Sequence, residues 1–329
     1  MKQAQFVFMV SRVDTSKAAS WLQTGNEARC LSIESLLRPV PDPVVIADMT
    51  DSTFTLRYAS HLGIRSTNEP LFGATLGTQD PVVHIEYAAD QGFSGMEDNF
   101  LMDRPVEQQV RIGETLARYG LEMGCFSSSF GFKQARWGTT DEAAGEQIEA
   151  EIRAALETAK RVRGRYIAIA ALRDLRVPLA YQQTAMVDHL RRVAPLAERA
   201  GVTLCLEQTS EFRVPGMLLH HIADAHAVVK AAKSPAVKLL FDFYHVQMMD
   251  GNIVDNLNLC WDEIAILQIA DVPGRTEIGI GELNWVTLLR ALRERGYKGL
   301  VEYEIFPTGQ GAAGERVALD ALRKIDAAL

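Results

Sequence analysis

The stretch Phe241-Asp242-Phe243-Tyr244-His245, followed by Gln268-Ile269-Ala270-Asp271-Val272-Pro273-Gly274-Arg275, decides the fold. Each half continues an apolar run into polar residues that an apolar core would exclude. The first run ends in the carboxylate Asp242, and the second ends in the amide Gln268. A short apolar run with polar boundaries is typical of a buried strand in a parallel sheet. We therefore expect two strands whose ends carry chemically active groups.

Two further apolar runs end in the same way. Val202-Thr-Leu-Cys-Leu-Glu207 ends in one glutamate, and Gly299-Leu-Val-Glu-Tyr-Glu304 ends in another. An isolated carboxylate at a strand end can simply cap a helix or solvate a loop. Several at successive strand ends would repel one another, and a divalent cation relieves such repulsion. Because no set of cysteines or histidines accompanies them, these oxygens favour Mg²⁺ or Mn²⁺, with Co²⁺ next and zinc less suited.

Short apolar segments alternate with longer amphipathic segments along most of the chain. Strict alternation of this kind predicts a parallel sheet in which a helix follows each strand. The eight predicted strands are Thr55–His61, Gly95–Phe100, Glu122–Ser127, Tyr166–Ala171, Thr203–Glu207, Val237–Phe243, Ile264–Ala270 and Leu300–Ile305. The predicted helices are Val82–Gln91, Glu107–Tyr119, Asp141–Arg163, Tyr181–Ala200, Leu218–Ala232, Trp285–Arg295 and Gly314–Ala328.

The number of repeats selects the architecture. Eight repeats over about 270 residues match the size of a closed (β/α)₈ barrel. The alternative is a doubly wound sheet, which a glycine-rich phosphate loop after the first strand would favour. The segment Leu71–Gly77 fits no such glycine spacing. We therefore predict an α/β fold with a single (β/α)₈ TIM barrel over residues 55–329, which forms the catalytic domain.

Residues 1–54 fit the barrel pattern poorly. Pro39, Pro41 and Pro43 indicate an extended connector. We expect an N-terminal extension that packs on the outside of the barrel or covers its bottom, and a lid or a subunit contact is the alternative.

Composition excludes some partners and favours others. The chain of 329 residues has a formal net charge of −8 and an isoelectric point near 5.5, so it lacks the basic surface of a nucleic-acid or anionic-membrane binder. Its four cysteines show no CxxC spacing, and its N-terminal apolar run is too short for a secretory signal. We expect a cytoplasmic protein that acts on a small molecule and is a candidate homo-oligomer.

Several longer motifs carry a resemblance to a known family. The chain resembles the xylose-isomerase-like TIM-barrel superfamily, and within it the hydroxypyruvate isomerases, over about residues 55–310. The loop Glu207–Arg213 and the segment Phe130–Trp137 depart from the family's usual pattern. The motifs that carry the likeness are Leu240–Gly251, Leu267–Arg275, Gly281–Trp285, Gly296–Gly299 leading to Glu304 and Pro307, and Val214–Met217.

The resemblance implies a ligand set for one divalent metal ion. In the family, glutamates that end the fifth and eighth strands bind the metal and flank the substrate, which corresponds to Glu207 and Glu304. The aspartate of the Asp-x-Tyr-His motif corresponds to Asp242. The remaining ligand is His in related ketose epimerases and Gln in hydroxypyruvate isomerases, so Gln268 points to the latter branch.

The resemblance also implies two substrate-binding residues. His245 corresponds to the motif histidine, although a packing role is the alternative. Arg275 corresponds to the loop arginine that would pair with a substrate carboxylate, against the alternatives of a solvated side chain or an ion pair with Glu277. The sequence pattern alone leaves the roles of two other acidic residues open. Glu302 shares a strand face with Glu304 and is expected deeper in the barrel with an arginine or lysine as candidate partner, and Glu97 is a candidate for the barrel mouth.

The implied reaction is the isomerisation of a small hydroxy-carbonyl compound through an enediolate, with hydroxypyruvate and tartronate semialdehyde, or a ketose, as model substrates. Glu207 and Glu304 would exchange a proton with adjacent substrate carbons, in an order that the sequence does not fix. A lyase or epimerase that uses the same metal–enolate chemistry on a keto-sugar is the alternative. An endonuclease of this superfamily would need many histidines, and the chain has seven. A non-catalytic binding module is disfavoured because all four candidate ligands are present.

Overall fold

The computed structural model describes residues 54–128 and 135–329. Almost all of the predicted extension 1–54, and most of Phe130–Trp137, lie outside the described residues. The described strands form one parallel sheet in the order β3-β2-β1-β9-β8-β7-β6-β5-β4. Their bounds are β1 (Arg57–His61), β2 (Gly95–Glu97), β3 (Glu122–Met123), β4 (Cys125–Ser127), β5 (Tyr166–Ile169), β6 (Thr203–Glu207), β7 (Val237–Asp242), β8 (Ile264–Ile269) and β9 (Leu300–Tyr303).

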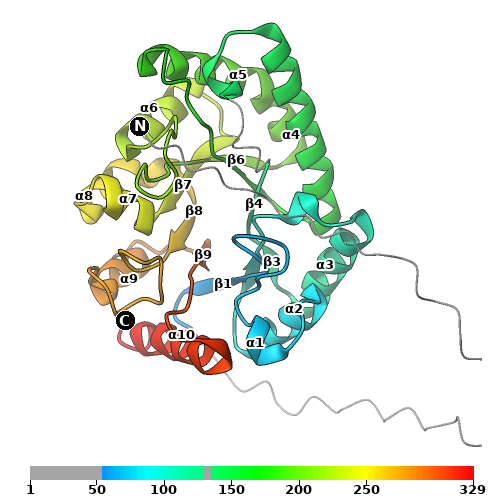
Figure 1. The fold of residues 1–329 in the computed structure, drawn as a ribbon, viewed down its shortest axis with the longest axis vertical. Helices are drawn as coiled ribbons and strands as arrows, with labels where there is room; N and C mark the ends of the chain where they lie inside the picture. The colour runs from blue at the N-terminus through cyan, green and yellow to red at the C-terminus, as the bar shows by residue number, and fades with distance from the viewer. Residues whose placement is uncertain (1–53, 129–134) are drawn as a thin grey trace, which may run out of the picture. The chain divides into compact units, whose positions relative to one another are not determined.

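The barrel closes within the third predicted strand. Glu122–Ser127 was predicted as one strand, and the structure divides it at Gly124 into β3, which pairs with β2, and β4, which pairs with β5. The first and last strands of the sheet order, β3 and β4, are therefore consecutive in the chain, and the sheet closes at Gly124. The Cys125 N–H donates at 2.5 Å to the Glu302 carboxylate inside the barrel, which explains the interruption of the strand. Figure 1 shows the resulting ring of strands with helices around it, which confirms the predicted (β/α)₈ barrel.

The helices lie where the amphipathic segments predict them, with shifted ends. The predicted strand end at Phe243 is wrong, because the Asp242 carboxylate accepts the Tyr244 N–H at 2.8 Å and begins a helix there. The predicted start at Leu218 is also wrong, because the Leu218 N–H bonds to the carbonyl of Ala171 in a loop. The helices are α1 (Gly73–Leu76), α2 (Pro81–Asp90), α3 (Val106–Tyr119), α4 (Glu142–Val162), α5 (Leu179–Ala200), α6 (Ile222–Ala232), α7 (Phe243–Met249), α8 (Ile253–Cys260), α9 (Trp285–Glu294) and α10 (Gly311–Asp326). None of the helices in the described ranges is long and apolar enough to cross a membrane.

The barrel interior changes from apolar to polar along β6 to β9. A small buried cluster that includes Cys205, Leu240, Ile266 and Leu300 fills one level. Because side chains two residues apart share a strand face, the next inward positions on these strands are Glu207, Asp242, Gln268 and Glu302. The apolar level thus supports a polar level at the C-terminal ends of the strands, where barrel enzymes place their active sites.

Close helix packing outside the sheet requires a glycine in α3. An added Cβ at Gly113 would lie 2.3 Å from the carbonyl oxygen of Arg161 and 2.9 Å from the Cα of Val162 in α4. We expect Gly113→Ala to destabilise the fold by about 1–3 kcal/mol, even though alanine favours helices, because the backbone must shift. Urea unfolding checks this. The exposed neighbour substitution Glu114→Ala is the control, and an equal effect of both substitutions would contradict the packing argument.

His61 at the end of β1 makes stability depend on pH. Its Nε2 lies 3.2 Å from the carbonyl oxygen of Ile305, and burial lowers its pKa to about 3. A histidine pKa below the unfolded value gives stability that is complete above about pH 6.5 and is lost as the pH falls toward 3. Between pH 6.5 and pH 5 this loss amounts to roughly 1.5 kcal/mol.

We expect His61→Gln, which keeps a donor for the Ile305 carbonyl, to remove this contribution to the pH dependence of the unfolding free energy. Unfolding free energies would be measured for the wild-type and His61→Gln proteins at several pH values. We expect the difference between the two proteins to become smaller as the pH falls below 6.5. Curves that stay parallel would show that His61 titrates normally in the folded protein.

Candidate active site

The four predicted metal ligands come together at the C-terminal ends of β6 to β9. Asp242 is 1% exposed, Gln268 is 2% exposed and Glu304 is 6% exposed, while Glu207 is partly buried. Asp242 pairs in register with Gln268, and Gln268 pairs with Glu302, so neighbouring strands bring these groups to one level. The strand-end pattern therefore identified positions that are adjacent in space.

Arg275 lies among these acids rather than in solvent. Its Nη1 is 2.8 Å from Asp242 Oδ2, and its Nη2 is 2.6 Å from Glu304 Oε2. The residue is 4% exposed. Although burial alone would lower its pKa, the charges of Asp242, Glu304 and Glu207 raise it above the ordinary value. The alternatives of a solvated arginine or a Glu277 ion pair are wrong, since Glu277 instead accepts hydrogen bonds from Thr308.

A buried loop carboxylate shapes the segment that delivers Arg275. Asp271 accepts backbone hydrogen bonds from Gly279 and Gly281 at 2.8 and 2.9 Å. An added Cβ at Gly281 would lie 2.1 Å from the carbonyl oxygen of Val272, so glycine is needed where the loop folds back. Arg275 itself has a positive φ of 57°. The loop between β8 and α9 is therefore built around Asp271, and it directs Arg275 inward.

His245 faces the acids from the first turn of α7. Its Nε2 lies 3.4 Å from Glu207 Oε1 and 3.6 Å from Asp242 Oδ2. The Ser210 N–H donates to its Nδ1 at 3.2 Å. Burial lowers the pKa of His245 to about 3, so the ring is neutral at pH 7. Nε2 lies 3.1 Å from Arg275 Nη1, and an arginine N–H can only donate, so hydrogen-bond donors face both ring nitrogens.

Burial raises the pKa of both candidate catalytic glutamates. For Glu207, the charges of Glu304 and Asp242 add to the effect of burial. For Glu304, burial outweighs the lowering by Arg275 and by Asn99, whose side chain donates to Glu304 Oε1 at 3.0 Å. Such a shift brings a carboxyl group closer to neutral pH, where it can both accept and release a proton.

Oxygen atoms with unused acceptor capacity suit a bound cation. Gln268 Oε1 and Asp242 Oδ2 are buried and accept no hydrogen bond within the described ranges, although Asp242 Oδ2 has its ion-pair contact with Arg275. Glu207, Asp242 and His245 each offer a ligand atom, and these atoms lie within 4.8 Å of one another. The sequence analysis assigned His245 to substrate binding. In the structure it also lies close enough to Glu207 and Asp242 for the three side chains to share one ion. The donor set fits a divalent ion that prefers oxygen.

Sequence reasoning missed several contacts that shape this site. Asn99, Ser210 and Asp271 were not singled out, and they respectively contact Glu304, contact His245 and hold the Arg275 loop. The glycines around Asp271 were a readable signal of a tight loop. The contacts of Asn99 and Ser210 depend on barrel closure and loop folding, so no local pattern announces them.

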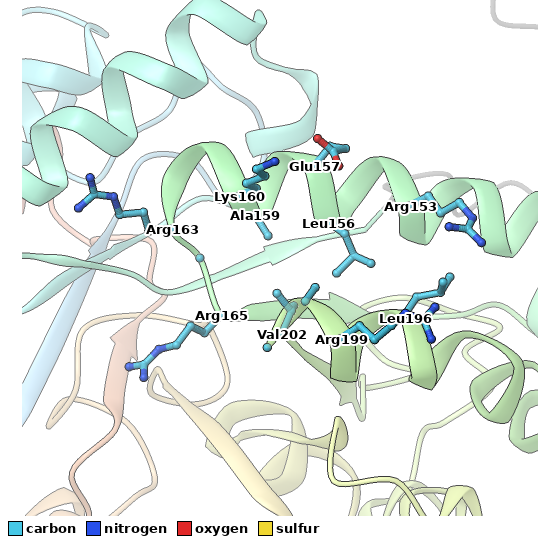
Figure 2. Close-up of a pocket in the computed structure, with 13 residues that line it drawn as sticks. Arg153, Leu156, Glu157, Ala159, Lys160, Arg163, Arg165, Leu196, Arg199 and Val202 are labelled. Carbon is cyan, nitrogen blue, oxygen red and sulfur yellow. The ribbon is translucent and has the colours of Figure 1, made fainter.

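A large cleft at the other end of the barrel has different properties. It has a volume of about 700 Å³ and lies between the C-terminal ends of α4 and α5, which precede β5 and β6 (Figure 2). Its walls carry Arg153, Lys160, Arg163, Arg165 and Arg199. Basic residues at helix C-termini complement the helix dipole, which accounts for many of these charges without a ligand. The cleft is remote from the strand ends that carry the acids.

Comparison with known proteins places the chain in a family. The family described as xylose isomerase-like TIM barrel matches residues 85–326. The chain therefore belongs to the xylose isomerase-like TIM-barrel family, in agreement with the motifs and the fold.

Curated relatives of the chain are isomerases. The hydroxypyruvate isomerase of Escherichia coli (strain K12) is 28% identical over 253 residues, which cover 73% of this chain and 93% of that protein. The 2-oxo-tetronate isomerase of Pectobacterium atrosepticum is 29% identical over 260 residues, which cover 74% and 95%. A solved structure from Brucella melitensis described as an AP endonuclease, family 2, covers 79% of this chain and 96% of its own with a TM-score of 0.68. At 24% identity that likeness shows the fold alone.

Proposed function

We propose that the protein is a metal-dependent isomerase of a small hydroxy-carbonyl compound of the hydroxypyruvate or tartronate semialdehyde type. The observation that carries the proposal is the pair of buried glutamates, Glu207 and Glu304, whose pKa values are both raised and which share the surroundings of Arg275 and Asp242. The names of the curated relatives support the same reaction class.

The two glutamates exchange protons with the substrate. One removes the proton from the hydroxyl-bearing carbon next to the carbonyl group, and the other delivers a proton to the carbonyl carbon. The hydroxyl proton passes to the former carbonyl oxygen, so that the carbonyl and hydroxyl groups change places. Glu207 ends β6 and Glu304 follows β9, so both carboxyl groups lie at the same end of the barrel and can reach one bound substrate. His245 lies beside Glu207 and Asp242, where it contacts a substrate oxygen and orients it.

Glu207, Asp242, Gln268 and Glu304 would hold one divalent cation, with Mg²⁺ or Mn²⁺ favoured and Co²⁺ also suited. Such an ion supplies polarisation of the substrate carbonyl and stabilisation of negative charge as it develops. The buried Gln268 Oε1, which accepts no hydrogen bond from a described residue, supports this assignment.

Two arginines at the mouth favour an anionic substrate over a neutral ketose. The Cζ atoms of Arg65 and Arg213 lie 3.6 and 5.5 Å from the ring centre of Phe306, so two guanidinium groups share one aromatic platform. Neither forms an ion pair with another described residue, whereas Arg275 is engaged by Asp242 and Glu304. The Arg213 N–H donates to the carbonyl of Ser210, whose own N–H donates to His245, so the same turn joins Arg213 to His245. Two neighbouring unpaired cations suit a carboxylate.

The cellular setting follows from weaker features. Cys125, Cys205 and Cys260 are free and buried, as is usual in a reducing compartment. We propose a cytoplasmic protein with a small-molecule substrate and no nucleic-acid or membrane partner, and a homo-oligomer remains a candidate state.

The proposed reaction is tested by proton exchange. Protein stripped with a chelator and reloaded with Mn²⁺ should exchange the α-protons of hydroxypyruvate with deuterated water, as measured by NMR. We expect Glu207→Gln and Glu304→Gln each to reduce exchange at least 100-fold or so, because each removes a proton-transfer group. Glu114→Gln on the exposed face of α3 is the matched control. In a parallel reaction in ordinary water, products of unchanged mass would support isomerisation and products of lower mass would indicate a lyase. No exchange in deuterated water on hydroxypyruvate or a panel of ketoses would refute the proposal.

The arginine platform is tested by substrate selectivity. We expect the double substitution Arg65→Gln with Arg213→Gln to lower kcat/KM for hydroxypyruvate about tenfold or more, since charged hydrogen bonds are lost. Dihydroxyacetone has a hydroxymethyl group in place of the carboxylate, so its turnover should change little. Arg118→Gln, in the last turn of α3 at the opposite end of the barrel, is the control. An equal loss on both substrates would contradict carboxylate recognition at Phe306.

A further inference from the structure

A second layer of polar side chains lies directly against Gln268. Glu97 on β2 and Glu302 on β9 are each 0% exposed. The Gln268 Nε2 group donates to Glu97 Oε1 at 3.0 Å and to Glu302 Oε2 at 3.1 Å. The expectation of an arginine or lysine partner for Glu302 is therefore wrong, because the partners in the structure are the Gln268 amide and the Cys125 N–H.

This contact fixes which way the Gln268 amide points. An amide NH₂ group has two hydrogens to donate, and the two carboxyl groups use both. In the structure it is the nitrogen side of the amide that faces both carboxyl groups. The amide oxygen Oε1 must therefore face away from Glu97 and Glu302, and it is left without a hydrogen bond from any described residue.

The backbone holds Glu302 in this position. Its Oε1 accepts the Cys125 N–H at 2.5 Å, and an added Cβ at Gly124 would lie 2.2 Å from the same oxygen. The glycine that interrupts the third strand thus leaves room for the carboxylate. Glu302 is fixed by the barrel wall, so it can act as a rigid acceptor for Gln268.

We propose that Glu97 and Glu302 are positioning residues that hold the Gln268 side chain with its oxygen toward the cation. This inference rests on the proposed metal-dependent function and deepens it. It also explains why an amide, rather than a third carboxylate, occupies position 268. A carboxylate there would place three buried acidic groups within hydrogen-bond distance, and once ionised it would have no proton to donate to Glu97 or Glu302.

The test is a cycle of substitutions read by Mn²⁺ affinity. Free Mn²⁺ is measured by electron paramagnetic resonance during titration of the metal-free protein. Glu97→Gln with Glu302→Gln offers Gln268 both donors and acceptors, so the amide can turn. We expect Mn²⁺ affinity to fall about tenfold or more, as is typical when a ligand loses its supporting partner.

The decisive comparison is Gln268→Glu in two backgrounds. In the wild-type background we expect this substitution to weaken Mn²⁺ binding and to lower the melting temperature of the metal-free protein. In the Glu97→Gln, Glu302→Gln background the new carboxylate gains two amide donors. There we expect the same substitution to restore Mn²⁺ affinity, so that its effect reverses sign. Glu263→Gln, remote from the site in an ion pair with Lys238, is the matched control and should leave Mn²⁺ affinity unchanged.

Two outcomes would overturn the inference. If Gln268→Glu changes Mn²⁺ affinity by the same factor in both backgrounds, Glu97 and Glu302 do not orient the amide, while the proposed function stands. If the wild-type protein binds no Mn²⁺, both the function and the inference fail. If the double variant does not fold, the single substitution Glu97→Gln can replace it, because it leaves the hydrogen bond from Cys125 to Glu302 intact. We then expect the same changes in Mn²⁺ affinity, but smaller ones.

Discussion

The main physical constraint on this site is that several acidic side chains are buried close to one another inside the barrel. In water such groups repel weakly, but in a protein interior the repulsion and the loss of hydration are both large. Within the described residues, the one arginine in ion-pair contact with this group is Arg275, which bridges Asp242 and Glu304. Burial, together with this excess of negative over positive charge, raises the pKa of the four glutamates. The acidic residues concerned are Glu97, Glu207, Asp242, Glu302 and Glu304.

Such an arrangement is costly to a fold that has no use for it. Burying an uncompensated carboxylate destabilises a protein, and well-packed apolar residues would serve stability better. The apolar level formed by Leu240, Ile266 and Leu300 shows that the same strands do pack an ordinary core two residues earlier. The acids are therefore concentrated at the strand ends, where they can act on a substrate and where a bound cation would balance their charge.

Local pattern was sufficient to predict the barrel and the strand-end acids. Leu240 and Asp242, or Ile266 and Gln268, are two residues apart, so a period-two strand places both inside, and the carboxyl end of a parallel strand opens on the mouth. Glu302 was expected below Glu304 for the same reason, and its burial agrees.

Contacts between distant parts of the chain were not predictable in this way. Gln268 and Glu97 are 171 positions apart and meet only because the barrel closes. The inward path of Arg275 depends on the loop around Asp271 and on a positive φ, which general propensities do not predict for an arginine. The division of the third strand at Gly124 depends on the carboxylate of Glu302, which lies far away in the sequence.

The central claim is that these acids surround one divalent cation, and anomalous diffraction tests it most directly. Crystals soaked in Mn²⁺ would be measured at a wavelength where manganese scatters anomalously. The account expects a single strong peak about 2.0–2.6 Å from oxygens of Glu207, Asp242, Gln268 and Glu304. A peak elsewhere, or no peak at saturating Mn²⁺ with Arg275 still bridging Asp242 and Glu304, would contradict it.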